Sequence, residues 1–289
     1  MDTQQPLVSV LMTAYNREQY IAEAIESVLA STYTHFELII VDDFSTDNTL
    51  CIAKSYQAND SRIRIYRNEK NLGQFPNRNR AAFYAKGKYL KYIDSDDKIL
   101  DFGLAYCVEQ MEKYPDAGLG MYHSYSMNNK ESECWPSEKI VREHFFVRPQ
   151  LSIGPTGTII KNDKFIEAGG FDTRFGVPSD MFFNIRFAAN SPIVLLPILF
   201  VYYRRHNGQE INNTMDYLKF GYLYFKELLQ NIPLPLKKKE VSYLYRKMQK
   251  RHSINLVKYY WKTKDFTTTK KVMQETNFTL TDLIVSFFK

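Results

Sequence analysis

Consecutive apolar residues alternate with helically spaced apolar residues at the start of the chain. Residues 7–12 and 36–42 are dominated by consecutive apolar side chains, a pattern that predicts strands buried inside a parallel sheet. Residues 16–31 carry apolar side chains three and four positions apart, which predicts an amphipathic helix. Asn16 is the expected N-cap of this helix, with Gln19 at the capping-box position.

The same alternation continues through the first hundred residues. Strands are predicted at 62–68 and 89–94. A loop with a short helix is predicted at 45–56, and a helix that begins near Pro76 at 74–86. Strands that alternate with helices favour an α/β fold, in which a Rossmann-like, mostly parallel sheet carries helices on both faces.

The alternation loosens after residue 101. Further segments are predicted as two strands, a helix and a buried strand, at 118–127, 156–161, 179–190 and 193–203. From Tyr217 onward the pattern is mainly helical, with a Pro-containing break at 232–239. We therefore expect an α/β domain over residues 1–215 and a C-terminal helical extension over residues 216–289.

Composition narrows the class of protein. Of 289 residues, 44% are hydrophobic and 24% are charged, as in ordinary globular proteins. The three cysteines show no C-x-x-C spacing, which argues against a disulfide framework or zinc cluster and fits a reducing cytoplasm. The N-terminus lacks a signal-peptide pattern, and the longest apolar run, 193–203, is too short to cross a bilayer. A cytoplasmic location without a membrane-spanning helix is expected.

Charge is unevenly distributed along the chain. The formal net charge is +6, but residues 236–289 contain 13 Lys/Arg against 4 Asp/Glu, a local +9, which leaves −3 for residues 1–235. Residues 236–262 mix these basic side chains with Tyr, Leu, Val and Trp, a composition typical of helices that lie on anionic membrane surfaces. The alternative is a helical cap with a solvated basic face. Peripheral contact with the inner face of a membrane is expected, and nucleic acid is not expected as a partner.

Polar clusters follow three of the predicted strands, at 13–16, 42–43 and 94–97. Ligands of open α/β sheets bind at the carboxyl ends of the strands, so these clusters should line one crevice. Asp94 and Asp96 would point to the same side of a strand, roughly 6–7 Å apart at Cα, and would repel each other unless a cation or proton intervenes.

A lone D-x-D can also be a polar turn in which Asp97 or Asp101 caps the next helix. The three clusters together favour a different interpretation, because they form an acidic crevice beside an aromatic side chain, Tyr15. Such a crevice suits a base or a sugar together with a divalent cation that prefers oxygen ligands.

At this point the sequence resembles a known family. The segments "VSVLMTAYNREQYIAEAIESVL", "ELIIVDDFSTDNT", "NLGQFPNRNRAAFYAKGKYLKYIDSDD", "GGFD" and "SDMFFNIRF" occur in the order seen in family 2 glycosyltransferases with the GT-A fold. The resemblance covers residues 6–206 and implies an inverting, nucleotide-sugar-dependent enzyme. It implies that Thr13, Tyr15 and Asp43 hold the nucleoside, with Tyr15 stacked on the base, and that Arg78 approaches the donor.

The resemblance also implies the metal site and the catalytic base. Asp94 and Asp96 form the D-x-D, with Asp96 the direct ligand of Mn²⁺ or Mg²⁺ and Asp94 nearer the ribose. His206, in "YYRRH", corresponds to a histidine that reaches the metal or diphosphate. Asp180 takes the place of the family's base, although Ser179 stands where the family usually has glutamate.

The expected function is therefore transfer of a sugar, with inversion, from a UDP-sugar to a hydroxyl of a glycan or lipid-linked acceptor in cell-surface polysaccharide synthesis. One alternative is a non-catalytic member of the same fold that binds a nucleotide-sugar or glycan without turnover. A dinucleotide-dependent oxidoreductase is disfavoured, because "TAYNRE" rather than G-x-G-x-x-G follows the first strand.

Overall fold

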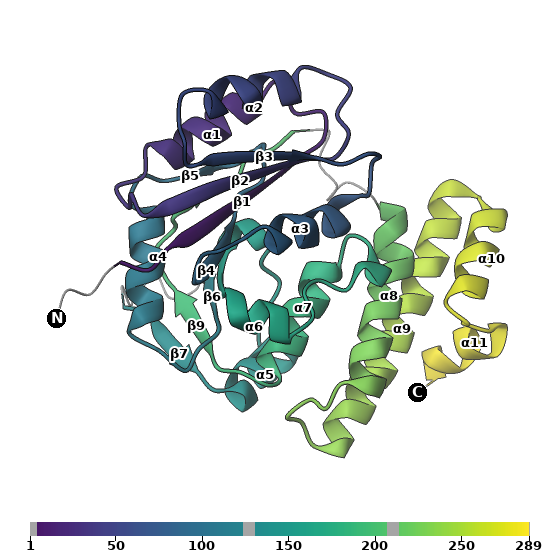
Figure 1. The fold of residues 1–289 in the computed structure, drawn as a ribbon. Helices are drawn as coiled ribbons and strands as arrows, with labels where there is room; N and C mark the ends of the chain where they lie inside the picture. The colour runs from purple at the N-terminus through teal and green to yellow at the C-terminus, as the bar shows by residue number, and fades with distance from the viewer. Residues whose placement is uncertain (1–4, 124–130, 207–213, 289) are drawn as a thin grey trace.

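The computed structural model describes residues 5–123, 131–206 and 214–288. Its centre is an eight-stranded sheet in the order β3-β2-β1-β4-β8-β6-β9-β7 (Figure 1). The strands are β1 (Val8–Ala14), β2 (Phe36–Asp42), β3 (Ile63–Arg67), β4 (Tyr89–Tyr92), β6 (Leu119–Tyr122), β7 (Glu133–Trp135), β8 (Thr158–Lys161) and β9 (Ile193–Leu196).

Six of these strands run in one direction. Strands β3, β2, β1 and β4 pair in parallel, and β8 lies antiparallel between β4 and β6. Strand β6 is therefore parallel to β4, and β9 is parallel to β6, whereas β7 pairs antiparallel with β9 at the sheet edge. The carboxyl ends of β1, β2, β3, β4, β6 and β9 meet at one edge of the sheet.

Helices cover both faces of the sheet, as predicted, and each face has its own apolar core. One core packs α1 (Ile21–Leu29), α2 (Thr49–Gln57) and α4 (Gly103–Glu112) against the sheet. The opposite core packs α3 (Gln74–Phe83), α5 (Ser137–Phe146), α6 (Asn162–Glu167) and α7 (Ser179–Ala188). A short ribbon of β5 (Lys98–Ile99) and β10 (Val201–Tyr202), and the 3₁₀ helices η1 (Pro155–Gly157) and η2 (Thr173–Phe175), complete this part of the chain.

Two predicted elements differ most from the structure. The first helix begins at Ile21 and not after Asn16, because Asn16 adopts a left-handed conformation (φ 51°) and its side chain accepts a hydrogen bond from Thr46 N at 2.9 Å. The strand expected at 193–203 is interrupted: β9 ends at Leu196, directly before Pro197, and β10 resumes at Val201. Proline lacks the N–H that continued pairing would use. The last part of the strand expected at 118–127 lies outside the described residues.

Four helices follow: α8 (Thr214–Asn231), α9 (Lys238–Thr263), α10 (Phe266–Glu275) and α11 (Leu280–Phe288). Figure 1 shows α8 lying between α7 and the other three helices. Arg142 of α5 pairs with Glu240 of α9 at 2.6 Å, and Phe145 stacks on Phe225 with ring centroids 5.5 Å apart. The helical region is therefore packed onto the α/β part. The domain boundary at residue 215 stays a prediction.

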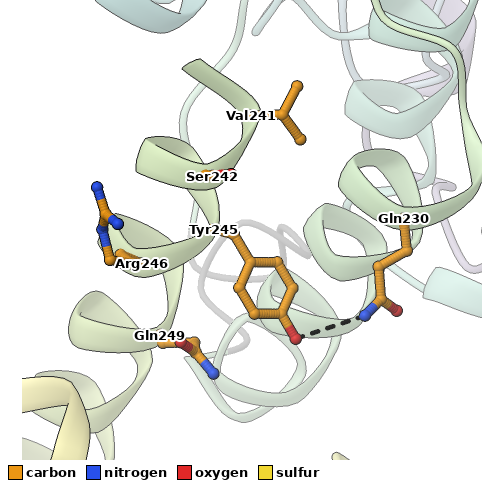
Figure 2. A pocket seen from close by; sticks show the side chains of 6 residues that line it. All are labelled: Gln230, Val241, Ser242, Tyr245, Arg246 and Gln249. Atoms are coloured by element: carbon orange, nitrogen blue, oxygen red, sulfur yellow. Dashed lines mark hydrogen bonds between the residues drawn. The ribbon is translucent and has the colours of Figure 1, made fainter. Parts of the chain in front are cut away.

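A hollow of about 730 Å³ lies against α8 and α9. Figure 2 shows its six lining side chains, with a hydrogen bond of 3.4 Å between Gln230 and Tyr245. None of the six is a carboxylate, so this hollow lacks the cation ligands that the sequence predicts. Among the described residues, no helix combines the length and apolar character needed to cross a bilayer.

Candidate active site

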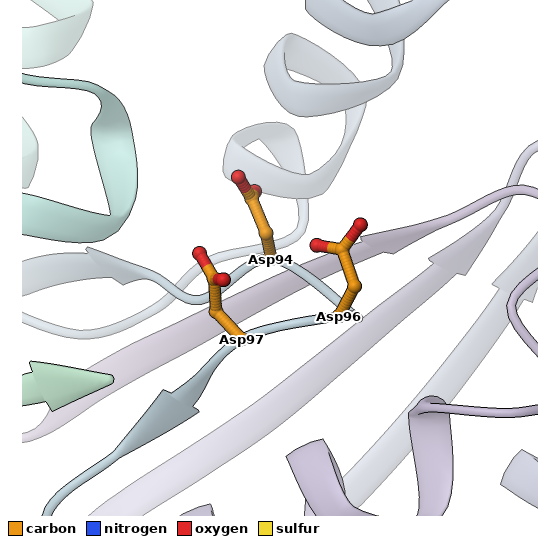
Figure 3. A group of neighbouring side chains, drawn as sticks. All are labelled: Asp94, Asp96 and Asp97. Atoms are coloured by element: carbon orange, nitrogen blue, oxygen red, sulfur yellow. The ribbon is translucent and has the colours of Figure 1, made fainter. Parts of the chain in front are cut away.

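Three carboxylates converge where β4 ends. The strand stops at Tyr92, two residues earlier than predicted, and the chain turns so that Asp97 N donates to Asp94 O at 2.9 Å. One carboxylate oxygen from each of Asp94, Asp96 and Asp97 lies within 4.8 Å of the others (Figure 3). Strand alternation predicted only the first pair, and the turn adds Asp97 to the group. We call residues 94–97 the acidic turn.

Asp96 lies between two basic side chains. Arg17 Nε donates to Asp96 Oδ2 at 3.1 Å, and His206 Nε2 lies 2.9 Å from the same oxygen. The His206 ring stacks on Tyr20, with centroids 4.7 Å apart. The structure thus brings His206 to the acidic turn from 110 residues away. Sequence analysis missed Arg17, although it follows directly after the polar cluster at 13–16.

Arg204 and Arg78 supply further positive charge. The Arg204 backbone N–H donates to Asp97 Oδ1, and its Nε donates to the Asp96 carbonyl, both at 2.9 Å. Arg78 Nη2 pairs with Asp94 Oδ1 at 2.8 Å. Its side chain is only 2% exposed, and its Nε has no hydrogen-bond partner among the described residues. Arg204 belongs to the "YYRRH" segment, but sequence analysis selected only its histidine.

The three carboxylates fit a divalent cation. Two effects raise the pKa of Asp97 to about 7: burial, which is the larger, and repulsion from Asp94. Each additional negative charge in this confined group is unfavourable. A bound cation would relieve this repulsion. Clustered carboxylate oxygens are the ligands that Mg²⁺ and Mn²⁺ prefer, and an imidazole can complete the set for Mn²⁺. Asp94, Asp96, Asp97 and His206 could therefore hold such an ion.

The end of β1 lies beside the acidic turn. Ser95 Oγ donates to Thr13 O at 2.9 Å, which fixes the turn against β1. Tyr15, two residues beyond, is 43% exposed. An exposed ring at the rim of a ligand crevice can provide a stacking surface. The structure thus places Thr13 beside the acidic turn, and the predicted contacts of Thr13 and Tyr15 with the nucleoside stay predictions.

Asp43 is buried and supports a neighbouring loop. Its Oδ1 accepts hydrogen bonds from Asn68 Nδ2 at 2.6 Å and Leu72 N at 2.9 Å, and its Oδ2 accepts from Gly73 N at 2.9 Å. Gly73 has a φ of 88°, a conformation that favours glycine. Asp43 therefore orders the loop that leads into α3, and its predicted contact with the nucleoside stays a prediction.

Asp180 lies in the first turn of α7, where a helix was predicted. Its Oδ1 accepts a hydrogen bond from Met181 N at 2.6 Å. Burial raises its pKa to about 6, with opposing electrostatic effects from Arg78 and Asp94. Asp180 lies near the acidic turn, because Gly154 lies beside it and Thr156, two residues after Gly154, accepts a hydrogen bond from Asp94 N at 3.2 Å. Gly154 is a direct neighbour of this carboxylate, since a Cβ at position 154 would lie 3.8 Å from Asp180 Oδ2, an ordinary van der Waals distance.

A buried lysine joins the acidic turn to η1. Lys91 in the middle of β4 is fully buried, and its Nζ donates to the carbonyl oxygens of Tyr92, at 2.9 Å, and of Thr156. Thr156 Oγ1 in turn accepts from Asp94 N at 3.2 Å. Sequence analysis did not single out Lys91, although a lysine among consecutive apolar strand residues was a sign of an internal role.

Comparison with solved structures identifies the fold. The structure of Staphylococcus aureus TarS residues 1–349 in complex with UDP aligns with a TM-score of 0.71 at 20% identity, covering 96% of this chain and 80% of that one. The mannosyltransferase PcManGT from Pyrobaculum calidifontis, in complex with GDP-Man and Mn²⁺, aligns with a TM-score of 0.66 at 14% identity, covering 99% and 87%. The chain thus has the GT-A fold.

The family is shown by sequence. The model of glycosyl transferase family 2 matches residues 9–160, more than half of the chain, and the chain belongs to this family. The putative teichuronic acid biosynthesis glycosyltransferase TuaG of Bacillus subtilis (strain 168) is 44% identical over 98 residues, which are 34% of this chain and 39% of TuaG. The chain spans about two fifths of the length of the first curated relatives it matches.

Proposed function

We propose that the protein transfers a sugar, with inversion, from a UDP-sugar to a hydroxyl of a glycan or lipid-linked acceptor, in the synthesis of a cell-surface polysaccharide. The observation that carries this proposal is the convergence of Asp94, Asp96 and Asp97 beside Arg17 and His206. The UDP bound to TarS and the name of TuaG support the donor and the pathway class.

In this proposal Thr13, Tyr15 and Asp43 hold the nucleoside at the carboxyl ends of β1 and β2. Asp94 lies nearer the ribose, and Arg78 reaches the donor from α3. Arg78 supports this role, because its buried guanidinium contacts Asp94 and still has an unpartnered Nε among the described residues. A buried polar atom without a partner costs free energy, and a bound donor could satisfy it.

Asp96 and His206 would hold the cation, with Asp94 and Asp97 beside them. Mn²⁺ or Mg²⁺ supplies Lewis-acid stabilisation of the charge that develops on the leaving diphosphate. The Mn²⁺ of PcManGT supports this choice of ion. Arg17 lies at Asp96 Oδ2, so its guanidinium is also placed to contact a diphosphate oxygen.

Asp180 acts as the general base. It accepts the proton of the acceptor hydroxyl while the oxygen attacks the anomeric carbon from the face opposite the diphosphate. The new glycosidic C–O bond forms as the bond to the diphosphate oxygen breaks, and UDP leaves with that electron pair. A pKa of about 6 leaves Asp180 ionised near pH 7 while making it more basic than an exposed aspartate, as general-base catalysis requires.

Asp96→Ala tests the proposal through binding. Calorimetric titration of wild type with UDP should show affinity that increases with Mn²⁺. The variant should lose that increase while keeping its melting temperature, because Asp96 lies in a turn and not in an apolar core. Asp116→Ala removes an exposed carboxylate at the opposite edge of the sheet and should behave as wild type.

Two results would count against the proposal. Mn²⁺-dependent UDP affinity that is unchanged in Asp96→Ala would exclude this residue as a ligand. UDP-sugar binding by wild type without transfer to any acceptor and without donor hydrolysis would instead favour a non-catalytic member of the family.

We also propose that the protein acts at the cytoplasmic face of a membrane, with its basic C-terminal region against anionic lipid. Lys247, Lys250 and Lys258 are exposed on α9, and Tyr243 and Trp261 are exposed on the same helix. Basic and aromatic side chains together favour binding at a lipid headgroup layer. A lipid-linked acceptor would make such contact useful.

A further inference from the structure

A second hollow, of about 280 Å³, lies where β6, β7 and β9 meet α5. We call it the β7–α5 pocket. Its apolar lining includes Trp135, Leu195 and Pro197, and its deepest polar groups are His123 and Gln150, which are 7% and 6% exposed. The volume is near the lower limit for small-molecule sites, so it suits a single ring and not an extended chain.

The β7–α5 pocket is connected to the proposed base by a short, fixed segment. Gln150 lines the pocket, and four residues later Gly154 lies next to Asp180. Four residues span at most about 14 Å. Asn184 of α7 donates to the carbonyl oxygens of Leu151 and Ile153 at 3.1 and 2.9 Å and holds the segment against the helix that carries Asp180.

The strand order of the sheet also places the pocket near the proposed active site. Only β8 separates β4, which leads into the acidic turn, from β6, which leads into His123. Strands separated by one other strand lie about 10 Å apart, and β4 and β6 are parallel. Figure 1 shows β6, β9 and β7 together on the side of the molecule away from α2 and β3. The pocket is therefore beside the proposed donor crevice, within reach of a substrate that extends past Asp180.

Hydrogen-bonding groups suited to hydroxyls surround the pocket. Glu131, Glu133 and Glu143 are among its lining residues, and carboxylate oxygens accept hydrogen bonds from donor groups. Glu133 also accepts from Trp135 Nε1 at 2.8 Å, which fixes the indole. An indole that is held in place beside acceptor oxygens can contact the C–H surface of a sugar ring while its hydroxyls bind the carboxylates.

The charges around the pocket disfavour an anionic ligand. Three carboxylates line it against one guanidinium, that of Arg148, and the Lys139 ammonium lies 3.8 Å from the Trp135 ring centroid. Burial lowers the pKa of His123, which keeps its ring neutral near pH 7. Among the described residues, these side chains carry three negative and two positive charges, a net −1 even when Lys139 is included. A ligand with its own negative charge would be repelled.

We propose that the β7–α5 pocket binds an uncharged sugar unit of the acceptor and rejects a unit that carries a carboxylate or a phosphate. This inference rests on the sugar transfer proposed above and adds the class of acceptor. It makes Trp135 and Glu143 specificity determinants that do not touch the reacting atoms.

The fluorescence of Trp135 can report sugar binding in the β7–α5 pocket. The chain has two tryptophans, and Trp261 is 66% exposed, so Trp261→Phe leaves Trp135 as the only indole. Fluorescence would be titrated with glucose and galactose and with the matched acids glucuronate and galacturonate, at saturating UDP and Mn²⁺ to occupy the donor crevice. A monosaccharide should bind with a dissociation constant on the order of 1–10 mM. Wild type, titrated by calorimetry, provides an independent check.

We expect a saturable change with at least one neutral sugar and binding at least about 5-fold weaker for its matched acid, a typical effect of one like-charge contact. Glu143→Gln should reduce this ratio several-fold, whereas Glu138→Gln, an exposed carboxylate on the same helix outside the pocket, should leave it unchanged. Equal binding of sugar and acid, or no saturation by any neutral sugar in either assay, would overturn the inference. UDP binding in the same samples reports separately on the proposed function.

Discussion

At Asp180, burial and the helix N-terminus act on one carboxylate in opposite directions. The N-terminus of α7 and the hydrogen bond from Met181 N favour the charged form. Burial opposes it and is the largest influence, so the pKa rises to about 6. Asp180 thus remains charged at neutral pH while being more basic than a surface aspartate, a combination that suits a general base.

Replacing Asp180 by asparagine should separate catalysis from binding. Asparagine keeps the shape, and its side-chain oxygen can still accept the hydrogen bond from Met181 N. UDP affinity with Mn²⁺ should therefore stay within about 3-fold of wild type. Transfer should fall by at least about 10²-fold. In wild type, transfer should rise with pH through about 6 and then level off, and this rise should be absent from the residual rate of the variant. Transfer rates close to wild type would place the base elsewhere.

The same pKa makes a prediction for stability. Because the folded-state pKa of Asp180 lies above its ordinary value of 3.8, the folded state binds more protons than the unfolded state between about pH 4 and 6. The extra unfolding free energy that this proton binding provides is therefore lost as the pH rises through about 6. Relative to Asp180→Asn, wild type should lose roughly 2–3 kcal/mol of unfolding free energy over this range. Urea unfolding of both proteins between pH 4.5 and 7, as an approximate working range, measures this difference; parallel curves would contradict it.

Site residues were predictable where they belong to a recognisable motif. They were not predictable where only contacts between distant segments bring them to the site. Asp94 and Asp96 stand out in the sequence, and the structure brings Asp180 and His206 near them. Arg17 and Arg204 were not selected, although both stand beside predicted site residues, because their contacts with the acidic turn join residues 79 and 108 positions apart. His206, 110 positions from Asp96, was reached only through the family resemblance. Long-range pairs of this kind depend on the packing of the whole sheet.

At the level of elements, the acidic turn depends on η1. Thr156 Oγ1 accepts from Asp94 N at 3.2 Å, while Lys91 Nζ bonds to the Thr156 carbonyl. A turn between two strands is held by few bonds of its own, since only Asp97 N to Asp94 O closes it internally. The 3₁₀ helix that precedes β8 thus holds the backbone of Asp94 in place at the start of the turn.

Thr156→Val tests this dependence. Valine matches threonine in shape but can neither accept the bond from Asp94 N nor make the side-chain hydrogen bond that favours the charged form of Asp97. The turn therefore loses hydrogen bonds worth about 1 kcal/mol each. We expect Mn²⁺ affinity to fall by about 5-fold, as measured by calorimetry, with the fold intact. Thr158→Val is the control, because its Oγ1 donates to Pro155 O and not to the acidic turn. An equal loss of Mn²⁺ affinity in both variants would indicate a general loosening of η1 instead.

Element boundaries were predictable where hydrophobicity sets them. The strand predicted at 36–42 matches β2 residue for residue, because a buried central strand has apolar side chains on both faces. The helix predicted from Asn16 begins five residues later, because residues 16–18 bond across to residues 45–49 of the neighbouring loop. Those contacts override a local capping pattern, and nothing in the local sequence reveals them.

At the level of the whole molecule, the basic region is part of the packed structure. Leu228 of α8 is buried in the same core as α3 and α7, and α9 pairs with α5 through Arg142 and Glu240. Removing everything after residue 231 would therefore expose apolar surface and confuse loss of folding with loss of membrane contact. Surface charge substitutions leave this packing unchanged and give a cleaner test of the proposed membrane contact.

The triple variant K247Q/K250Q/K258Q removes three exposed charges from one face of α9, since these positions recur with helical spacing. Each lysine near an anionic surface contributes about 1 kcal/mol, so the variant should bind anionic liposomes about 10²-fold more weakly in sedimentation. Wild-type binding should decrease as salt rises, because the attraction is electrostatic. The matched control K54Q/K70Q/K86Q removes three exposed charges from the α/β part and should bind as wild type. If the region is only a solvated helical cap, neither wild type nor either variant should sediment with the liposomes. Equal loss of binding in both variants would show that net charge, and not the α9 face, attracts the protein to lipid.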